Sequence, residues 1–291
     1  MKHLKTTIAI LTLLFTMASC NKDDEVAPDP KTFQYRIKEQ RDKDNVLKKS
    51  YLYNDRNQVV KELGKNGEVN KQYVYNSAGF LINRSNGNDL TSYVLNNDGR
   101  ILEEITDLNS GEKTKIVYMY NPDGKVIEEK YYKFISASNV FQYEYNNTYY
   151  YNSNNQLGQV LSLEYVPIGE TTPRFEQTSD YLYDDRGNVN SVIIKKSPVS
   201  NGNTEKVEEI LFVYDNMKLS NYSFGSFFNN IVFKNNIIEY TVTAFDRNGS
   251  VKSKNTIVAK HTYNEAGYIT KTIAGTVGYE ATTNYILEKI N

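Results

Sequence analysis

The chain of 291 residues contains no tryptophan, one cysteine, two histidines and six prolines. A single cysteine excludes any disulfide bond within the chain. His3 lies in the N-terminal segment, so His261 is the one histidine in the rest of the chain. A single histidine without a cysteine partner cannot build a His/Cys zinc site. No Gly-x-Ser-x-Gly segment is present to suggest a Ser-His-Asp triad. We therefore expect His261 to be a core or edge residue, and we expect neither a catalytic site nor a metal or cofactor.

The chain also lacks a strong net charge and a long apolar run. It has 34 Lys and Arg against 35 Asp and Glu, a net charge of −1. Without Lys2 and Lys5 the balance is 32 against 35, or −3. This near-neutral balance gives no electrostatic reason to expect binding to nucleic acid or to an anionic membrane. No segment keeps a 3.6-residue apolar period, so we expect almost no helix.

The N-terminus has the pattern of an export signal. Lys2 and Lys5 precede an apolar run over 8–15, which ends close to Cys20 and is too short to span a bilayer. The segment resembles a bacterial lipoprotein signal, which implies cleavage before Cys20 and acylation of that residue. Met17 departs from the Leu, Val or Ile usual in that family. The alternative is an ordinary secreted protein with a stray thiol.

A short tether follows the cysteine. Asn21-Lys-Asp-Asp-Glu25 resembles the surface-export signal of Bacteroidetes-type lipoproteins. The resemblance implies an outer-membrane protein, anchored through lipid alone and facing the cell exterior. Pro28 and Pro30 stiffen the rest of the tether, since proline fixes φ. We predict a signal peptide over 1–19, a lipidated cysteine and tether over 20–32, and one domain over 33–291.

The most abundant feature is tyrosine, with 25 residues, many of them in a repeated phrase. Its clearest copy runs from Tyr118 through Tyr120, Asn121 and Gly124 to Val126. A strand points Tyr118 and Tyr120 to one face. Asn121 opens a turn, and Gly124 supplies the positive φ that closes it. A type I turn ending in a left-handed glycine is a common hairpin connection, so the phrase predicts a β-hairpin.

Nine copies of this phrase and a terminal half-copy occupy the chain. They begin at Tyr51, Tyr73, Tyr93, Tyr118, Tyr149, Tyr181, Phe212, Thr243 and His261, and the half-copy is Tyr285–Ile290. The copies resemble the YD-type repeats of bacterial Rhs-like proteins and of Bacteroidetes-type surface lipoproteins of unknown function. The resemblance covers about residues 33–290 and implies a scaffold rather than a site.

These copies predict an all-β fold, an antiparallel meander of about ten hairpin repeats. About twenty strands at about 4.8 Å spacing would make a ribbon about 95 Å wide, and such sheets twist and coil. We expect a coiled single sheet, an open barrel or a spiral, with the repeat tyrosines in its core. Apolar residues also occur on the opposite face of the first units, at Leu52, Val74, Val94 and Met119. We therefore expect the N-terminal half to be covered on both faces, by the chain itself or by a partner.

Three adjacent carboxylate pairs, Glu103-Glu104, Glu128-Glu129 and Glu208-Glu209, are candidates for acid–base chemistry. Neighbours on a strand point to opposite faces, so the two carboxylates of a pair do not converge on one substrate bond. We expect them to be solvated. Segments of calcium-loop composition, such as 96–99, lack EF-hand spacing and are explained by turn chemistry.

The best candidates for ligand binding are aromatic. The densest group comprises Tyr131, Tyr132, Phe141, Tyr143, Tyr145, Tyr149 and Tyr151. On a strand, Tyr143 and Tyr145 should share a face, as should Tyr149 and Tyr151. Exposed aromatic side chains suit sugar rings and protein partners. A second group is Phe224, Phe227 and Phe228, and the alternative for both groups is sheet core.

We therefore expect a monomeric, non-catalytic, lipid-anchored surface protein that binds a glycan or a protein through exposed aromatics, or serves as a scaffold. One alternative is a carbohydrate-active hydrolase whose carboxylates are brought together by the fold. The other is a structural shell or assembly component. An apolar patch left open around Leu52, Val74 and Val94 would favour that last reading.

Overall fold

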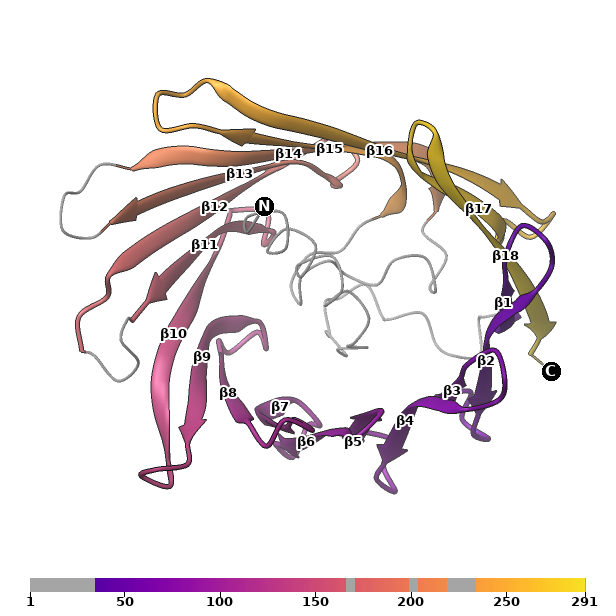
Figure 1. Cartoon of the computed structure of the whole chain (residues 1–291), viewed down its shortest axis with the longest axis horizontal. Coiled ribbons are helices and arrows are strands. Elements are labelled where there is room, and N and C mark those ends of the chain that lie inside the picture. The colour runs from indigo at the N-terminus through magenta and orange to yellow at the C-terminus, as the bar shows by residue number, and fades with distance from the viewer. Residues whose placement is uncertain (1–34, 166–170, 199–203, 219–233, 291) are drawn as a thin grey trace.

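The computed structural model describes residues 35–165, 171–198, 204–218 and 234–290, all in strands and turns (Figure 1). The strands are β1 (Tyr35–Arg41), β2 (Leu47–Tyr53), β3 (Val59–Leu63), β4 (Val69–Tyr75), β5 (Leu81–Asn86), β6 (Asp89–Leu95), β7 (Ile101–Asp107), β8 (Lys113–Tyr120), β9 (Val126–Ile135), β10 (Val140–Tyr151), β11 (Leu157–Glu164), β12 (Phe175–Tyr183), β13 (Val189–Pro198), β14 (Glu205–Lys218), β15 (Asn235–Phe245), β16 (Val251–Tyr263), β17 (Ile269–Thr276) and β18 (Tyr279–Lys289). Within these ranges, no helix has the length and apolar character needed to cross a membrane.

The strands form one closed antiparallel sheet. Each strand pairs with the next in sequence, and β18 pairs with β1, which closes an 18-stranded barrel (Figure 1). The predicted all-β meander is confirmed. The sheet closes on itself rather than remaining an open barrel or a spiral.

The repeated turn has the predicted chemistry. The amide of Gly124 donates to the carbonyl of Asn121 at 2.9 Å, and Gly124 has a φ of 82°. The side-chain oxygen of Asn121 accepts the amide of Lys125 at 2.8 Å. Asn57 and Asn155 replace the glycine in two units, with φ values of 61° and 60°. Asparagine tolerates this left-handed conformation better than most residues, which explains the substitution.

A β-bulge follows each of these turns. Tyr120 lies opposite Val126, as the turn predicts, but Met119 lies opposite Glu128, so Ile127 is an extra residue. The same one-residue shift occurs wherever an even-numbered strand pairs with the following odd-numbered strand. Bulges bend a strand and increase its twist. Their repetition at one end of the sheet explains how it coils far enough to close.

The two ends of the chain complete a ninth unit. Leu287 of the terminal half-copy lies opposite Ile37, and Ile286 lies opposite Glu39, so Lys38 takes the place of the bulged residue. Nine two-strand units therefore make the 18 strands. We call the end of the barrel where even-numbered strands turn into odd-numbered ones the repeat rim, and the other end the far rim. The Thr243 copy differs from the others, since its turn joins β15 to β16 at the far rim.

The second tyrosine of the phrase links neighbouring units. Its hydroxyl donates to a backbone carbonyl of the preceding unit at 2.5–2.9 Å. The six pairs are Tyr53 with Ile37, Tyr75 with Val59, Tyr120 with Ile101, Tyr151 with Val126, Tyr183 with Leu157 and Tyr214 with Val189. Leu95 and Leu287 occupy this position in two units and have no hydroxyl, and the hydroxyl of Tyr263 donates instead to the Asp215 carboxylate. The phrase thus encodes contact between hairpins as well as the hairpin itself.

The tyrosine face forms the inner wall of the barrel. Tyr118 and Tyr181 are 7% and 5% exposed, and Val192 is 1% exposed, as expected where side chains converge on a concave surface. The residues between the tyrosines point outward, and Leu52 and Val94 are 46% and 47% exposed. The prediction that the chain itself covers this second face of the N-terminal half is therefore wrong, and coverage by a partner stays a prediction.

The bulge explains this error. An unbroken register would place Leu52 opposite Val60 and Met119 opposite Ile127. The shifted register places them opposite Lys61 and Glu128. The outer wall therefore places charged side chains beside Leu52, Val94, Met119 and Val213, and uncharged polar ones beside Val74 and Leu182.

Candidate functional site

A second kind of bulge divides the predicted aromatic group. Tyr143 lies opposite Tyr132 and Tyr145 lies opposite Tyr131, so Glu144 is the extra residue. The rings of Tyr131 and Tyr145 stack at 4.0 Å, and those of Tyr132 and Tyr143 lie 5.5 Å apart. Because Tyr131 and Tyr132 are neighbours on one strand, the two pairs are on opposite faces. The prediction that Tyr143 and Tyr145 share a face is wrong, since it assumed a regular strand.

Tyr149 and Tyr151 do share a face. Both pack against the apolar cluster of the inner wall, which includes Leu157 and Val160. Burial, with Glu129 nearby, raises the pKa of Tyr149 well above its usual range. These two tyrosines are core residues rather than an exposed surface.

Tyr132, Phe141 and Tyr143 lie on the outer face. The Lys115 ammonium is 5.1 Å from the ring centroid of Tyr132 and 5.2 Å from that of Phe141. Phe141 also contacts Phe134, with 5.3 Å between ring centroids. None of the seven predicted residues is fully exposed. The second predicted group, Phe224, Phe227 and Phe228, lies outside the described residues, as do Cys20 and the predicted signal peptide.

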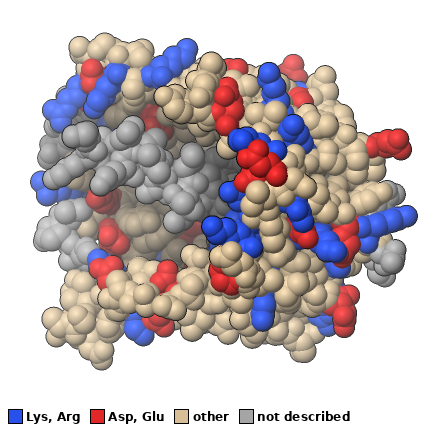
Figure 2. Space-filling view, turned by 45° about the vertical axis from the view of Figure 1, so that its right-hand side comes forward, with Lys and Arg blue, Asp and Glu red and all other residues tan. Residues whose placement is uncertain are grey.

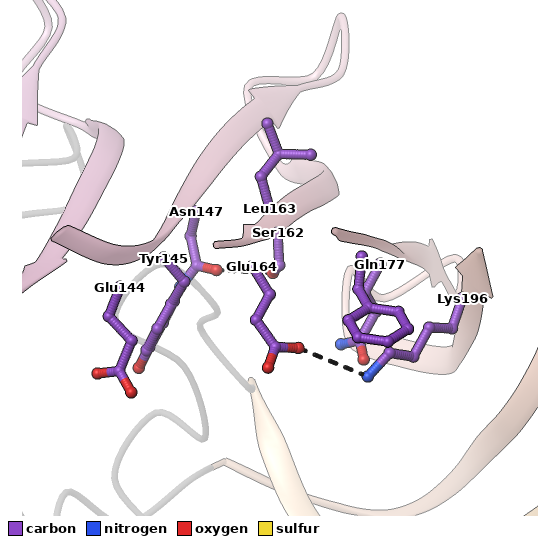
Figure 3. A pocket seen from close by; sticks show the side chains of 9 residues that line it. Glu144, Tyr145, Asn147, Ser162, Leu163, Glu164, Gln177 and Lys196 are labelled. Atoms are coloured by element: carbon purple, nitrogen blue, oxygen red, sulfur yellow. Dashed lines mark hydrogen bonds and ion pairs between the residues drawn. The ribbon is translucent and has the colours of Figure 1, made fainter. Parts of the chain in front are cut away.

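A cavity of about 330 Å³ lies on the inner wall, where β10 to β13 approach the far rim (Figure 3). Its volume is within the range of small-ligand pockets. It is lined by Glu144, Tyr145, Asn147, Ser162, Leu163, Glu164, Phe175, Gln177 and Lys196. In Figure 3 the side chains of Tyr145, Glu164 and Lys196 extend to the same side of the sheet, and Leu163 points away from them.

The aromatic walls of this cavity are held in place. Tyr131 stacks on one face of the Tyr145 ring, and the Tyr131 hydroxyl donates to Glu129 at 2.8 Å. Burial raises the pKa of both tyrosines, so both phenols are neutral at physiological pH. Across the cavity, the Lys196 ammonium lies 5.1 Å from the ring centroid of Phe175. Two flat apolar surfaces therefore face a common space.

Polar groups surround these rings. The hydroxyl of Ser162 donates to the side-chain oxygen of Asn147 at 2.6 Å. The Asn147 amide donates to Glu129 at 3.4 Å, and Lys196 forms an ion pair with Glu164 at 3.8 Å (Figure 3). Rings combined with amide, hydroxyl and carboxylate groups suit a ligand with a flat apolar face and many hydroxyl groups. Among the residues the structure describes, no three His, Cys, Asp or Glu side chains are grouped to hold a metal.

The inner wall carries a row of charged residues that the sequence pattern did not predict. In the first four units, Glu62, Arg84, Glu104 and Glu129 lie opposite the first tyrosine of the phrase. Glu62 is 5% exposed and Glu129 is 2% exposed. The prediction that both members of each carboxylate pair are solvated is wrong for Glu104 and Glu129. Only the bulged register reveals which member of each pair points inward.

These charges are paired. Lys49 lies 2.9 Å from Glu62, and Arg84 lies 3.9 Å from Glu104. The Tyr118 hydroxyl donates to Glu104 at 3.3 Å. Burial raises the pKa of Glu104, while Arg84 and this hydrogen bond oppose the rise. The arrangement is that of a buried polar network.

His261 has partners at both ring nitrogens. Nδ1 lies 3.0 Å from the hydroxyl of Thr272, and Nε2 lies 3.0 Å from the carbonyl oxygen of Ile237. The ring is half-buried at a position where other units carry tyrosine. The prediction of a core or edge histidine is confirmed.

The backbone is similar to several crystal structures from Bacteroides. A porin-like protein from Bacteroides vulgatus is 12% identical, with 86% of this chain and 97% of that chain covered and a TM-score of 0.47. A porin-like protein from Bacteroides uniformis is 14% identical, with coverages of 75% and 89% and a TM-score of 0.40. A protein of unknown function from Bacteroides fragilis is 12% identical, with coverages of 50% and 93% and a TM-score of 0.33.

No protein-family model and no curated protein matches the sequence. At the identities and TM-scores given above, the likenesses decide neither the family nor the function of the chain.

Proposed function

We propose that the protein is a non-catalytic saccharide-binding barrel, tethered to the outer membrane through an acylated Cys20 and facing the cell exterior. The observation that carries the binding proposal is the cavity between Tyr145 and Phe175, with its surrounding amide and hydroxyl groups. The signal-like N-terminus and the resemblance to Bacteroidetes-type YD-repeat lipoproteins support the location. The repeats supply the scaffold, and the cavity supplies the site.

The residue types on the outer wall favour a barrel that is surrounded by water rather than by lipid. A barrel that spans a bilayer carries an apolar outer band about 25 Å tall, and one Lys or Arg at its midplane costs about 2–4 kcal/mol. Here Lys61, Glu103, Glu128 and Glu239 lie beside the exposed apolar residues. Basic and acidic side chains are interspersed over the surface visible in Figure 2. Attachment through lipid agrees with such a wall.

The carboxylates of Glu62, Glu104 and Glu129 on the inner wall argue against the hydrolase alternative, because each is held by a structural partner. Glu62 forms an ion pair with Lys49, and Glu104 forms one with Arg84. Glu129 accepts hydrogen bonds from Tyr131 and Asn147. Carboxylates held in this way stabilise the wall, whereas a general acid and its partner must be free to meet a scissile bond.

The binding proposal is tested with a glycan array and the chain from Lys31, which retains every described strand. Tyr145→Ala should weaken binding at least about tenfold, or about 1.4 kcal/mol, because it removes one wall of the cavity. Tyr143→Ala is the matched control, since the bulge at Glu144 places that ring on the outer face. Absence of any glycan ligand, or equal losses in the two variants, would contradict the proposal.

The location is tested separately by protease shaving of intact cells. Digestion of the barrel before lysis is expected for a protein that faces the exterior. Cys20→Ser should release the protein from the membrane fraction. Digestion that requires lysis would exclude the outward orientation and leave the binding proposal intact.

A further inference from the structure

The cavity on the inner wall is built from two adjacent rows of side chains that cross strands β9 to β13. The strand registers place four inward-facing residues in the row nearer the far rim, namely Tyr131, Tyr145, Glu164 and Phe175. The adjacent row contains Asn147, Ser162, Gln177 and Lys196. Glu164 therefore lies between the two aromatic walls of the cavity.

Two carboxylates lie beside the Tyr145 ring. Glu164 is opposite Tyr145 on β11, and Glu144 precedes Tyr145 on β10. Burial raises the pKa of Tyr145, and the negative charge of Glu144 raises it further. Lys196 forms an ion pair with Glu164 at 3.8 Å, whereas no described residue forms an ion pair with Glu144 (Figure 3). The Tyr145 end of the cavity therefore carries a negative charge without a matching cation.

The basic groups of this region lie at the other end of the cavity. The Lys196 ammonium is 5.1 Å from the ring centroid of Phe175, and the Arg174 guanidinium carbon is 5.6 Å from the same centroid. On the opposite side, Lys133 of β9 forms an ion pair with Glu112 at 3.0 Å. The cavity thus has an acidic end and a basic end.

A chain of hydrogen bonds fixes the polarity of the second row. Glu129 accepts hydrogen bonds from the Tyr131 hydroxyl at 2.8 Å and from the Asn147 amide at 3.4 Å. Because the amide nitrogen of Asn147 is directed at Glu129, its oxygen is left to accept the Ser162 hydroxyl at 2.6 Å. A hydroxyl has one proton, so Ser162 offers only lone pairs to a ligand.

A smaller cavity, of about 190 Å³, adjoins this one at the far rim and differs in charge. It is lined by Phe175, Lys196, Glu205, Lys206, Val207, Phe245, Asp246 and Arg247. Three of these residues are basic and two are acidic, whereas the larger cavity has two acidic residues and one basic residue. The excess of negative charge is therefore particular to the cavity at Tyr145.

We propose that the ligand of the larger cavity is an amino sugar, whose ammonium group lies between Glu144 and Glu164 against the Tyr145 ring. An ammonium group donates three hydrogen bonds and accepts none, so it matches carboxylates and a lone pair. It also gains from the face of an aromatic ring. Tyr131 occupies one face of the Tyr145 ring, which leaves the face toward Glu164 for the ligand. This inference rests on the proposed saccharide binding and names the chemical class of its ligand.

The test compares three series of oligosaccharides that share a β-1,4-linked backbone and differ at C2. The units are glucosamine with an ammonium group, N-acetylglucosamine with an acetamide and glucose with a hydroxyl. Calorimetry with the chain from Lys31, at about pH 6 and low ionic strength, should show the glucosamine series binding at least about tenfold more tightly than the other two. Glu144→Gln should remove at least about fivefold of that affinity and leave the neutral series unchanged, and added salt should weaken the glucosamine series alone.

Glu176→Gln is the matched control. Glu176 adjoins Phe175 in sequence but lies opposite Leu163, which points away from the cavity (Figure 3). This variant removes the same charge from the outer face and should leave every affinity unchanged. Tri-lysine reports attraction by charge alone and should bind more weakly than the glucosamine series. Thermal unfolding of all variants separates loss of binding from loss of fold.

Four results would overturn the amino-sugar inference. These are failure of the glucosamine series to bind, equal affinities for the three series, equal losses in the two glutamine variants, and binding of tri-lysine as tight as that of the glucosamine series. In each case, any saccharide that loses affinity in Tyr145→Ala but not in Tyr143→Ala would still support saccharide binding. The two proposals therefore fail separately.

Discussion

The inner wall has two sectors that are built from the same unit but differ in chemistry. In the sector from β2 to β9, the residue opposite the first tyrosine is Glu62, Arg84, Glu104 or Glu129. In the sector from β10 to β15, the same position holds Val160, Val192 and Tyr240. The turn, the bulge and the tyrosine are common to both sectors. The repeated unit thus fixes the direction in which a side chain points, and the residue type at that position sets its chemistry.

The two sectors also differ in what they face. The apolar cluster around Leu157 and Val192 lies in the second sector, and the larger cavity lies further along the same strands, toward the far rim. The first sector instead has ion pairs and tyrosine hydroxyls directed at carboxylates. The candidate binding site is thus at the end of the apolar sector, where its strands extend past the core.

The largest effect on stability is expected from a charge introduced into the apolar sector. Val192→Asp should lower the free energy of unfolding by about 3–5 kcal/mol, because it buries a carboxylate without a partner. Leu182→Asp, on the outer face of the same hairpin, should change it by less than about 1 kcal/mol. Urea denaturation of both variants measures the difference. If Val192→Asp does not fold, Val192→Thr should still lose more stability than Leu182→Thr, and equal losses would contradict the assignment of faces.

The polar sector is tested by breaking one of its pairs. Arg84→Met should cost about 3 kcal/mol, because it leaves the Glu104 carboxylate buried without its cation. The double variant Arg84→Met/Glu104→Leu should recover at least half of that loss, since an apolar pair restores the chemistry of the second sector. A double-mutant cycle by urea denaturation gives the coupling. Additive losses would show that the two side chains do not depend on each other.

The pH dependence of stability provides a sharper test of Glu104. Because burial raises its pKa in the folded state, the folded protein retains the proton after the unfolded chain has lost it. The contribution of Glu104 to the free energy of unfolding should therefore fall as pH rises from its unfolded pKa to its folded pKa, by at most about 1.4 kcal/mol per pH unit. Glu104→Gln should remove this slope in denaturation measured between pH 4 and 7. An unchanged profile would place the carboxyl in water.

The smallest effect is expected where the two sectors are the same. Tyr75→Phe in the polar sector and Tyr183→Phe in the apolar sector should each cost about 1 kcal/mol, since each removes one hydroxyl bond to a carbonyl. Tyr150→Phe, at an exposed outer position, should cost close to nothing. Thermal or urea unfolding of the three variants checks this. Unequal losses in the first two would show that the contact between units depends on the sector.

Much of the fold could be predicted from the sequence because its determinants are local. The turn from Asn121 to Gly124 uses only its own side chain and backbone, and its chemistry predicts Tyr120 opposite Val126. Beyond that pair the prediction fails, because the extra residue at Ile127 interrupts the regular two-residue alternation that the prediction assumed. The same cause misplaced Tyr143 relative to Tyr145 and hid Glu104 and Glu129. Of the residues that line the candidate site, Tyr145 was predicted from the density of aromatic residues around it. No sequence pattern near Phe175 or Lys196 indicated that they would line the same cavity.

The repeated hairpin, its tyrosine face and the number of units to within one follow from the amino-acid sequence alone. Short-range physics is enough for these features, since a turn and a two-residue alternation involve only residues close in the chain. Three features became visible only in the folded barrel: the pairing of β1 with the terminal half-copy, the set of residues that face inward, and the position of the cavity. Each of these depends on the accumulated bend of all the bulges, and that bend is set only when the last strand meets the first.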